Sequence, residues 1–241
     1  FDTHTGGTKI LFEETTHTQI NLMPNADELP MLVPLPEAGE LLWFSERSDW
    51  GHLYLYDLDS GALKNTVTKG DWLVRDILHI DTHRREVFIQ TAGRAADRDP
   101  YYRDICRVHL DTEEITTLVS SDHDINAIIQ SQFATLNMAV FRDIKKSSAV
   151  SPSGNFAVVT QSRADETPIS FLVDRDGRNI LELETADISG LPDGWQWPEP
   201  VKLLAADGKT DIYGLVFRPS DFSPDKSYPV VSHVFNTPEM P

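Results

Sequence analysis

A strand–turn–strand unit recurs along this chain at intervals of 52 to 65 residues, and this repeat constrains the fold more than any other feature. Its turns, rich in aspartate and threonine or glycine, lie at residues 2–6, 57–61, 109–113 and 174–177. Each turn is followed by a short apolar stretch, and most turns are also preceded by two such apolar stretches. A repeat of about 50 residues with about four short strands is typical of the blades of a β-propeller.

The spacing divides the chain into the tail of one blade and three fuller blades. We place the tail at residues 1–20, with a strand at Lys9–Phe12, and the blades at 21–70, 71–121 and 122–188. Within the second of these segments, His52–Leu58 alternates with a period of two, as a strand does. About three and a half blades cannot close a ring. We therefore expect further blades upstream of Phe1, or a partner that covers the open edges.

A change in composition marks the end of the repeats. Residues 191–200 contain three prolines and two tryptophans, which fits a crossing between domains. Beyond it we expect a hairpin formed by Val201–Leu204 and Ile212–Arg218, and then a buried strand at Pro229–Phe235. The predicted domains are a partial propeller at 1–190 and, at 191–241, a linker with the first strands of a second domain.

Charge and cysteine content exclude several classes of function. The chain has 38 acidic and 21 basic residues, a net charge of −17, so its surface repels nucleic acid and anionic lipid headgroups. The single cysteine, Cys106, excludes an intrachain disulfide and a multi-cysteine metal centre, and we interpret it as a small buried apolar residue. The apolar runs are too short to span a membrane. Nothing in the sequence indicates a compartment.

The usual catalytic and metal-binding patterns are missing. There is no Gly-x-Ser-x-Gly motif, and Ser153 is interpreted as part of a turn. His79 and His83 straddle a strand end without a neighbouring glutamate motif. Asp57 begins an aspartate-rich turn that departs from the calcium-loop pattern, and we expect its carboxylate to bind nearby backbone amides. The sequence therefore predicts no metal and no cofactor.

Two surface features leave a choice of interpretation. The loop Arg94–Arg103 contains arginines and two tyrosines, which suit either a site for a peptide carboxylate or an arginine–aspartate surface network. The network is the favoured alternative. Trp50 either forms the wall of a binding site or closes the turn of its blade.

Several motifs resemble one known family in the same order along the chain. Residues 43–57 contain a Ser-Glu-Arg stretch that leads into a His-Leu-Tyr-x-Tyr-Asp strand. Further matches lie at 69–74, 99–103, 151–154 and 203–208, the last close to Lys-Leu-x-x-Ala-Asp-Gly. This pattern resembles the dipeptidyl peptidase IV branch of the prolyl oligopeptidase family of serine peptidases.

The resemblance implies an exopeptidase that removes dipeptides from N-termini. In the family, an eight-bladed propeller gates an α/β-hydrolase domain with a Ser–Asp–His triad. We expect the triad downstream of Pro241, and the paired glutamates that hold the substrate amine upstream of Phe1, so the fragment itself should be inactive. Glu13 and Glu14 follow the wrong strand for that role. The resemblance implies a peptide substrate and leaves a homodimer of the complete protein open.

One functional position of the family falls inside this chain. After the strand at 229–235 the family carries a tyrosine whose hydroxyl helps to stabilise the oxyanion, but here the residue is Phe235. Either Asn236 or a backbone amide supplies the donor, or the parent protein is a weak or inactive member. The second hypothesis is therefore a non-catalytic interaction module. A sugar- or metal-binding propeller is a third hypothesis, without a ligand cluster to support it.

Overall fold

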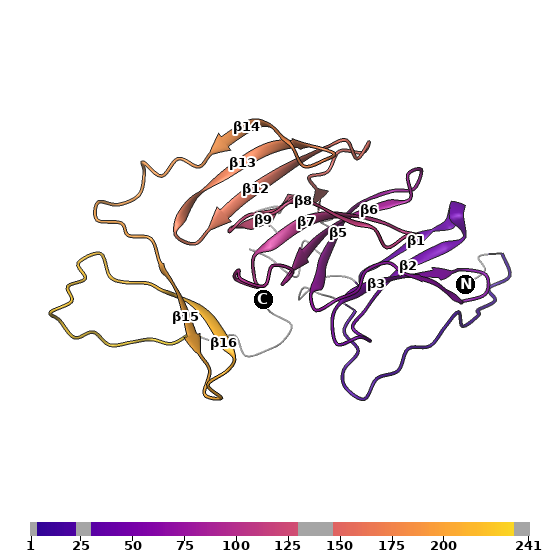
Figure 1. The fold of residues 1–241 in the computed structure, drawn as a ribbon, viewed down its shortest axis with the longest axis horizontal. Helices are drawn as coiled ribbons and strands as arrows, with labels where there is room; N and C mark the ends of the chain where they lie inside the picture. The colour runs from indigo at the N-terminus through magenta and orange to yellow at the C-terminus, as the bar shows by residue number, and fades with distance from the viewer. Residues whose placement is uncertain (1–3, 23–29, 130–146, 234–241) are drawn as a thin grey trace.

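The chain is described by a computed structural model in which residues 4–22, 30–129 and 147–233 are placed. Within these ranges the fold is almost entirely β: three four-stranded and two two-stranded antiparallel sheets. The helical structure in these ranges is one short 3₁₀ turn, Pro36–Ala38. The described residues therefore include no helix that is long and apolar enough to cross a membrane. Figure 1 shows the three larger sheets following one another from right to upper left, with a separate hairpin at lower left.

The three four-stranded sheets are the three predicted blades. Their strands are, in the first blade, β1 (Leu32–Leu35), β2 (Glu40–Ser45), β3 (His52–Asp57) and β4 (Leu63–Thr66); in the second, β5 (Leu73–Asp81), β6 (Glu86–Ala92), β7 (Arg103–His109) and β8 (Ile115–Val119); in the third, β9 (Asp124–Asn126), β12 (Phe156–Arg163), β13 (Glu166–Asp174) and β14 (Asn179–Thr185). Neighbours in sequence pair in each blade, apart from a small extra sheet, β10 (Ile128–Ile129) with β11 (Ser147–Ser148), between β9 and β12. The partial propeller predicted from the repeat is confirmed.

Hydrophobic cores fill the spaces between successive blades. One cluster joins the first and second blades and includes Leu42, Leu55 and Ile89, and another joins the second and third and includes Phe88 and Val173. The predicted alternation in β3 is confirmed, because its leucines and its tyrosines belong to different clusters on opposite faces. β3 is therefore covered on both faces, and residues 52–56 of the strand are all buried.

The aspartate-rich turns work as predicted. The Asp57 carboxylate accepts hydrogen bonds from the backbone amides of Asp59 and Ser60, at 3.1 and 2.7 Å. Asp174 accepts in the same way from the amides of Asp176 and Arg178, both at 2.9 Å. These bonds fix the tight turn between the third and fourth strands of a blade.

The strand predicted at Lys9–Phe12 is wrong as a strand, because no described neighbour pairs with these residues along their backbone. The segment nevertheless packs on the first blade. The ring of Phe12 stacks on Tyr56 with centroids 4.0 Å apart, and Glu14 accepts a hydrogen bond from the Trp43 indole at 3.0 Å. It thus covers the outer face of the first blade where a preceding blade would lie.

Beyond the third blade the predicted hairpin is confirmed as β15 (Glu199–Leu204) and β16 (Asp211–Val216). The buried strand predicted at Pro229–Phe235 is not found in its described part. Residues 229–233 have no strand partner among the placed residues, and Val230 and Val231 are 91% and 90% exposed. The domain boundary near residue 190 stays a prediction.

Candidate functional site: the loop face of the blades

Every second connection of an antiparallel sheet returns to the same edge, so five connections share one end of the blades. We call this end the loop face; it consists of residues 46–51, 67–72, 93–102, 120–123 and 164–165. Contacts between these connections and the strand ends beside them support the grouping: the Val74 amide of β5 donates to the Gly51 carbonyl at 2.8 Å, and Nε2 of His52 in β3 lies 2.9 Å from the Gly70 carbonyl oxygen.

The β6–β7 loop, residues 93–102, is held from inside by Arg98. Its guanidinium lies 2.8 Å from Asp104 Oδ2, and the two side chains are only 9% and 3% exposed. The same guanidinium donates to Ser120 Oγ at 3.1 Å and to the carbonyl of Tyr102 at 3.3 Å. A buried guanidinium with this many acceptors fixes the loop to the strand ends beneath it.

A second arginine ties the loop to the third blade. Arg103 donates to both carboxylate oxygens of Asp124, from Nε at 2.7 Å and from Nη2 at 2.6 Å. The hydrogen bonds that Arg103 donates to Asp124 raise the pKa of Arg103 above its usual range and outweigh the effect of burial. This two-pronged pair joins β7 of the second blade to β9 of the third.

The third arginine of the loop, Arg94, contacts the single cysteine, Cys106. Arg94 Nη1 lies 2.8 Å from Cys106 Sγ and 2.9 Å from Thr117 Oγ1, and its guanidinium stands 5.2 Å from the centre of the Trp72 ring. Cys106 is fully buried, as predicted, and burial raises the pKa of its thiol. A thiol held in its neutral form is a poor nucleophile.

The arginine–aspartate network predicted for this loop is therefore confirmed, but it is not a surface network throughout, since the Arg98–Asp104 pair is buried. Sequence reasoning missed this because the partners of the loop arginines, Asp104 and Asp124, lie outside the loop. The alternative, a carboxylate site, loses support because all three guanidiniums already bind protein acceptors. Trp50, at the tip of the β2–β3 connection, is 36% exposed and fits either earlier interpretation.

A cluster of ion pairs continues along the loop face beside the third blade. Arg163 lies 2.8 Å from Asp122 and 2.9 Å from Asp165, and His123 Nε2 lies 2.9 Å from Glu166. These groups are partly exposed, and together they join the start of β9 to the β12–β13 turn.

One aromatic side chain of the β6–β7 loop points away from this network. Tyr101 is 61% exposed, and its ring meets the ring of Tyr213 on β16 edge-on, with centroids 6.3 Å apart and an interplanar angle of 78°. Lys202 on β15 lies 5.5 Å from the same Tyr213 ring and 2.8 Å from Asp211. The hydrogen bond to Asp211 raises the pKa of Lys202. The loop face thus touches the hairpin.

The other residues considered from the sequence lie elsewhere. Ser153 Oγ lies 3.2 Å from Ser151 Oγ and 3.4 Å from the Asn155 amide, which confirms its place in a turn. His79 lies in β5 and His83 in the turn that follows it, and no group of three or more His, Cys, Asp or Glu in the placed ranges is arranged to hold a metal. Phe235 and Asn236 lie outside the described residues.

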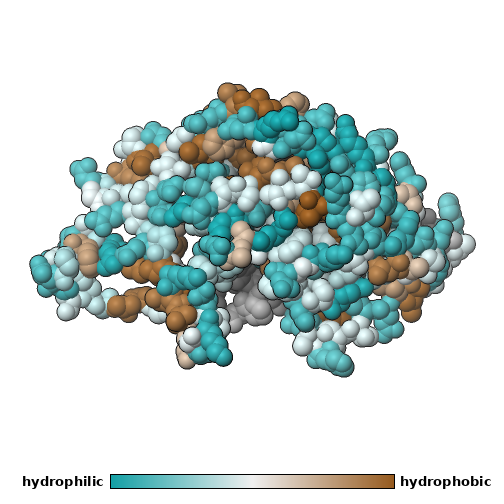
Figure 2. Space-filling model, viewed as in Figure 1, coloured by the Kyte–Doolittle hydropathy of each residue, from teal (hydrophilic) through white to brown (hydrophobic). Residues whose placement is uncertain are grey.

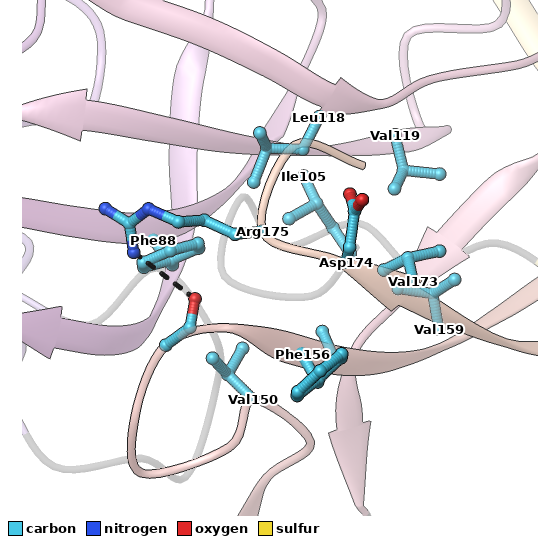
Figure 3. Close-up of a pocket in the computed structure, with 12 residues that line it drawn as sticks. Phe88, Ile105, Leu118, Val119, Val150, Phe156, Val159, Val173, Asp174 and Arg175 are labelled. Atoms are coloured by element: carbon cyan, nitrogen blue, oxygen red, sulfur yellow. Dashed lines mark hydrogen bonds between the residues drawn. The ribbon is translucent and has the colours of Figure 1, made fainter. Parts of the chain in front are cut away.

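The enclosed space between the second and third blades is too small for a substrate. Figure 3 shows it lined by aliphatic and aromatic side chains, with Arg175 reaching over one end to donate to the Gly154 carbonyl at 3.3 Å. Its volume is about 10 Å³, enough for about one water molecule. It is a packing seam between blades.

Exposed apolar side chains gather in two regions of the surface. Figure 2 shows hydrophilic side chains over most of this view, with apolar groups gathered over β13 and β14 and again over the hairpin. The exposed apolar residues of these regions are Ile180, Leu181 and Leu183 on β14, and Leu203, Leu204, Ile212, Leu215 and Val216 on the hairpin.

Comparison with known proteins gives one consistent family. Residues 1–168 match the family described as the dipeptidyl peptidase IV (DPP IV) N-terminal region. A "probable dipeptidyl peptidase 4" of Aspergillus fumigatus is 31% identical over 116 residues, 47% of this chain and 14% of the relative. Its counterpart in Aspergillus flavus is 27% identical over 199 residues, 80% of this chain and 22% of the relative. The chain thus spans a small part of the relatives it matches.

A solved structure gives the same fold. The crystal structure described as that of "a putative dipeptidyl aminopeptidase IV" from Bacteroides ovatus superimposes with a TM-score of 0.59 at 23% identity, over 82% of this chain and 27% of that one.

Proposed function

This chain belongs to the family of the dipeptidyl peptidase IV N-terminal region, and from that premise we propose that it is the propeller part of a serine exopeptidase that removes N-terminal dipeptides. Its own task is to scaffold and gate a hydrolase domain carried by the rest of the protein. The observation that carries the proposal is the family match over residues 1–168, which covers the first two blades and reaches β13 of the third.

The proposal divides the chain into two parts. Residues 1–190 belong to the propeller, and residues 191–241 are a linker and the leading edge of the α/β-hydrolase domain. The confirmed hairpin β15–β16 and the contact between Tyr101 and Tyr213 support this division, because they place a separate small sheet against the loop face.

The substrate of the complete protein is then a peptide with a free N-terminus. The 241 residues contain no Gly-x-Ser-x-Gly nucleophile motif, so we propose that they are inactive when separated from the rest. The test is to measure release of p-nitroaniline from Gly-Pro-p-nitroanilide by the complete protein and by this chain alone. Turnover by the complete protein only is expected, and turnover by this chain alone would overturn the assignment.

Within this function Phe235 stands where the family's oxyanion-stabilising tyrosine is expected. Loss of one such donor typically lowers turnover by about 100- to 1,000-fold. We therefore expect Phe235→Tyr in the complete protein to raise turnover, by up to about 100-fold, without changing the melting temperature. If an active wild type gains nothing from the substitution, Asn236 or a backbone amide already supplies the donor.

The missing hydroxyl at Phe235 also favours a second candidate, a propeller that binds partners without hydrolysing them. The two candidates differ in a nucleophilic serine. A fluorophosphonate probe should label the complete protein if it is a peptidase, and Gly-Pro-p-nitroanilide should compete with the label. No labelling and no turnover, in the wild type and in Phe235→Tyr alike, would favour the interaction module.

A further inference from the structure

Tyr101 is placed in an unusual way for an aromatic side chain on a polar loop. It is 61% exposed, although its neighbours in the loop are held by buried or partly buried arginines. Its backbone amide donates to Asp99 Oδ1 at 2.9 Å, and the Tyr102 amide donates to the Asp99 carbonyl at 3.1 Å. These bonds form a tight turn that holds the ring outward.

The support beneath this turn is rigid. Arg98 joins the loop to Asp104 on β7, and also to Ser120 Oγ just beyond the end of β8. Buried charge-assisted hydrogen bonds hold a short loop in one conformation, because breaking them leaves a charge without a partner. The backbone that carries Tyr101 therefore has a fixed position relative to the second blade.

The opposite side of the contact is also supported. Tyr213 lies on β16 and pairs across the hairpin with Lys202 on β15. The ammonium group of Lys202 lies over the Tyr213 ring. An edge-on contact between two aromatic rings depends on how the rings are oriented. Because the backbone at Tyr101 is held by its loop and the Tyr213 ring is packed by Lys202, this contact restricts how the hairpin moves against the blades.

We propose that Tyr101 is a positioning residue that docks the β15–β16 hairpin on the second blade through Tyr213. The docking holds the linker at residues 191–198 close to the blades. That this linker joins a propeller to a hydrolase domain rests on the proposed function, whereas the docking itself does not.

Limited proteolysis of the complete protein tests the docking directly. Trp195 in the linker is 47% exposed and is followed by Gln196, so chymotrypsin cleavage after Trp195 can report how often the linker opens, whereas Trp197 is followed by Pro198 and is not a cleavage site. Tyr101→Ala and Tyr213→Ala should each speed cleavage there by about 3- to 10-fold, the range expected for one aromatic pair. The double variant should be no faster than the single ones, and Tyr101→Phe should behave as wild type, because the ring makes the contact.

The matched control is Trp50→Ala, an exposed aromatic on the same loop face but on the first blade. It should leave the cleavage rate unchanged. The proposal is wrong if Tyr101→Ala cleaves no faster than Trp50→Ala, or if the effects of the single variants multiply in the double one. If Tyr101→Ala lowers the melting temperature, Tyr213→Ala gives the same test from the hairpin side.

Cleavage is measured without substrate. A complete protein that lacks peptidase activity therefore still tests the docking, and a failed docking test leaves the peptidase proposal standing.

Discussion

The first two blades and the third blade have the same architecture but not the same surroundings. One position on the second strand of each blade shows the difference. It is the residue that pairs with the third strand two residues before that strand ends, and it is occupied by Leu42, Phe88 and Val158 in the three blades. They are 0%, 3% and 38% exposed. The first two lie against the next blade, and Val158 faces away from the second blade. Burial in this fold is therefore supplied by the neighbour and not by the blade itself.

A polar position two residues earlier shows the same difference. Glu40 of the first blade, 2% exposed, binds Arg85 of the second at 2.5 Å. Glu86 of the second blade forms an ion pair with Arg175 of the third. The third blade has Phe156 there, 47% exposed. A carboxylate–guanidinium pair thus joins the first blade to the second, and another joins the second to the third. At the same position the outward face of the third blade is apolar.

The largest effect should separate two leucines. Leu55→Ala removes a fully buried side chain from the core between the first two blades, and we expect a loss of about 3 kcal/mol in the free energy of unfolding. Leu181→Ala on β14, where the leucine is 55% exposed, should cost less than about 1 kcal/mol. Urea unfolding followed by circular dichroism measures both. Equal losses would mean that the third blade is as well covered as the first.

The Glu40–Arg85 pair should rank second. Glu40→Gln removes the charge from a carboxylate that also binds Lys64 at 2.5 Å, and we expect a loss of about 2 kcal/mol, since Arg85 keeps Asp111 as a partner. The exposed pair Glu199–Arg218 is the control, and Glu199→Gln should cost under about 1 kcal/mol. A Glu40 variant as stable as the Glu199 variant would contradict the role of the pair between the blades.

Acid should also weaken the interface between the first and second blades, by less per pH unit than the loss expected for Glu40→Gln. Burial alone would raise the pKa of Glu40, but the hydrogen bonds from Arg85 and Lys64 lower it below its ordinary value of 4.5. Its stabilisation is therefore complete above pH 4.5, the unfolded value, and is lost as the pH falls through the folded pKa. Between the wild type and Glu40→Gln, the pH dependence should differ by at most about 1.4 kcal/mol per pH unit. Melting curves from pH 7 to pH 3 would show it, and parallel curves would count against it.

The smallest effect concerns Val158. Val158→Thr on the exposed face of the third blade should change the free energy of unfolding of this chain by less than about 0.5 kcal/mol. The same substitution should cost more in the complete protein if further blades cover the face. Identical costs in the two would mean that Val158 stays exposed there.

The sequence predicted the blades well because local patterns determine them. The aspartate turn at Asp57 and the two-residue alternation of β3 are visible in the sequence and reappear in the structure. The strands at Lys9–Phe12 and Pro229–Phe235 were not found in their described parts, because a strand needs a partner backbone and neither apolar run has one among the placed residues.

The loop face was predictable in composition only. The arginines of residues 94–103 indicated an ion-pair network, but which acid each binds depends on β7 and β9 meeting across two blades. The contact of Tyr101 with Tyr213 joins residues more than a hundred positions apart, and no local signal marks either ring.

Two glycines in equivalent turns set how closely the first and third blades approach the repeat before them, whereas the second blade has Glu113 in its turn. A Cβ on Gly61 would lie 1.7 Å from the Leu11 carbonyl oxygen, and a Cβ on Gly177 would lie 1.9 Å from that of Leu118. Both glycines also have φ above +70°. At these two turns the backbone lies directly on the backbone of the preceding repeat, so the spacing there does not depend on which side chains fill the core. Repeats built in this way can diverge in sequence and still stack at a constant pitch.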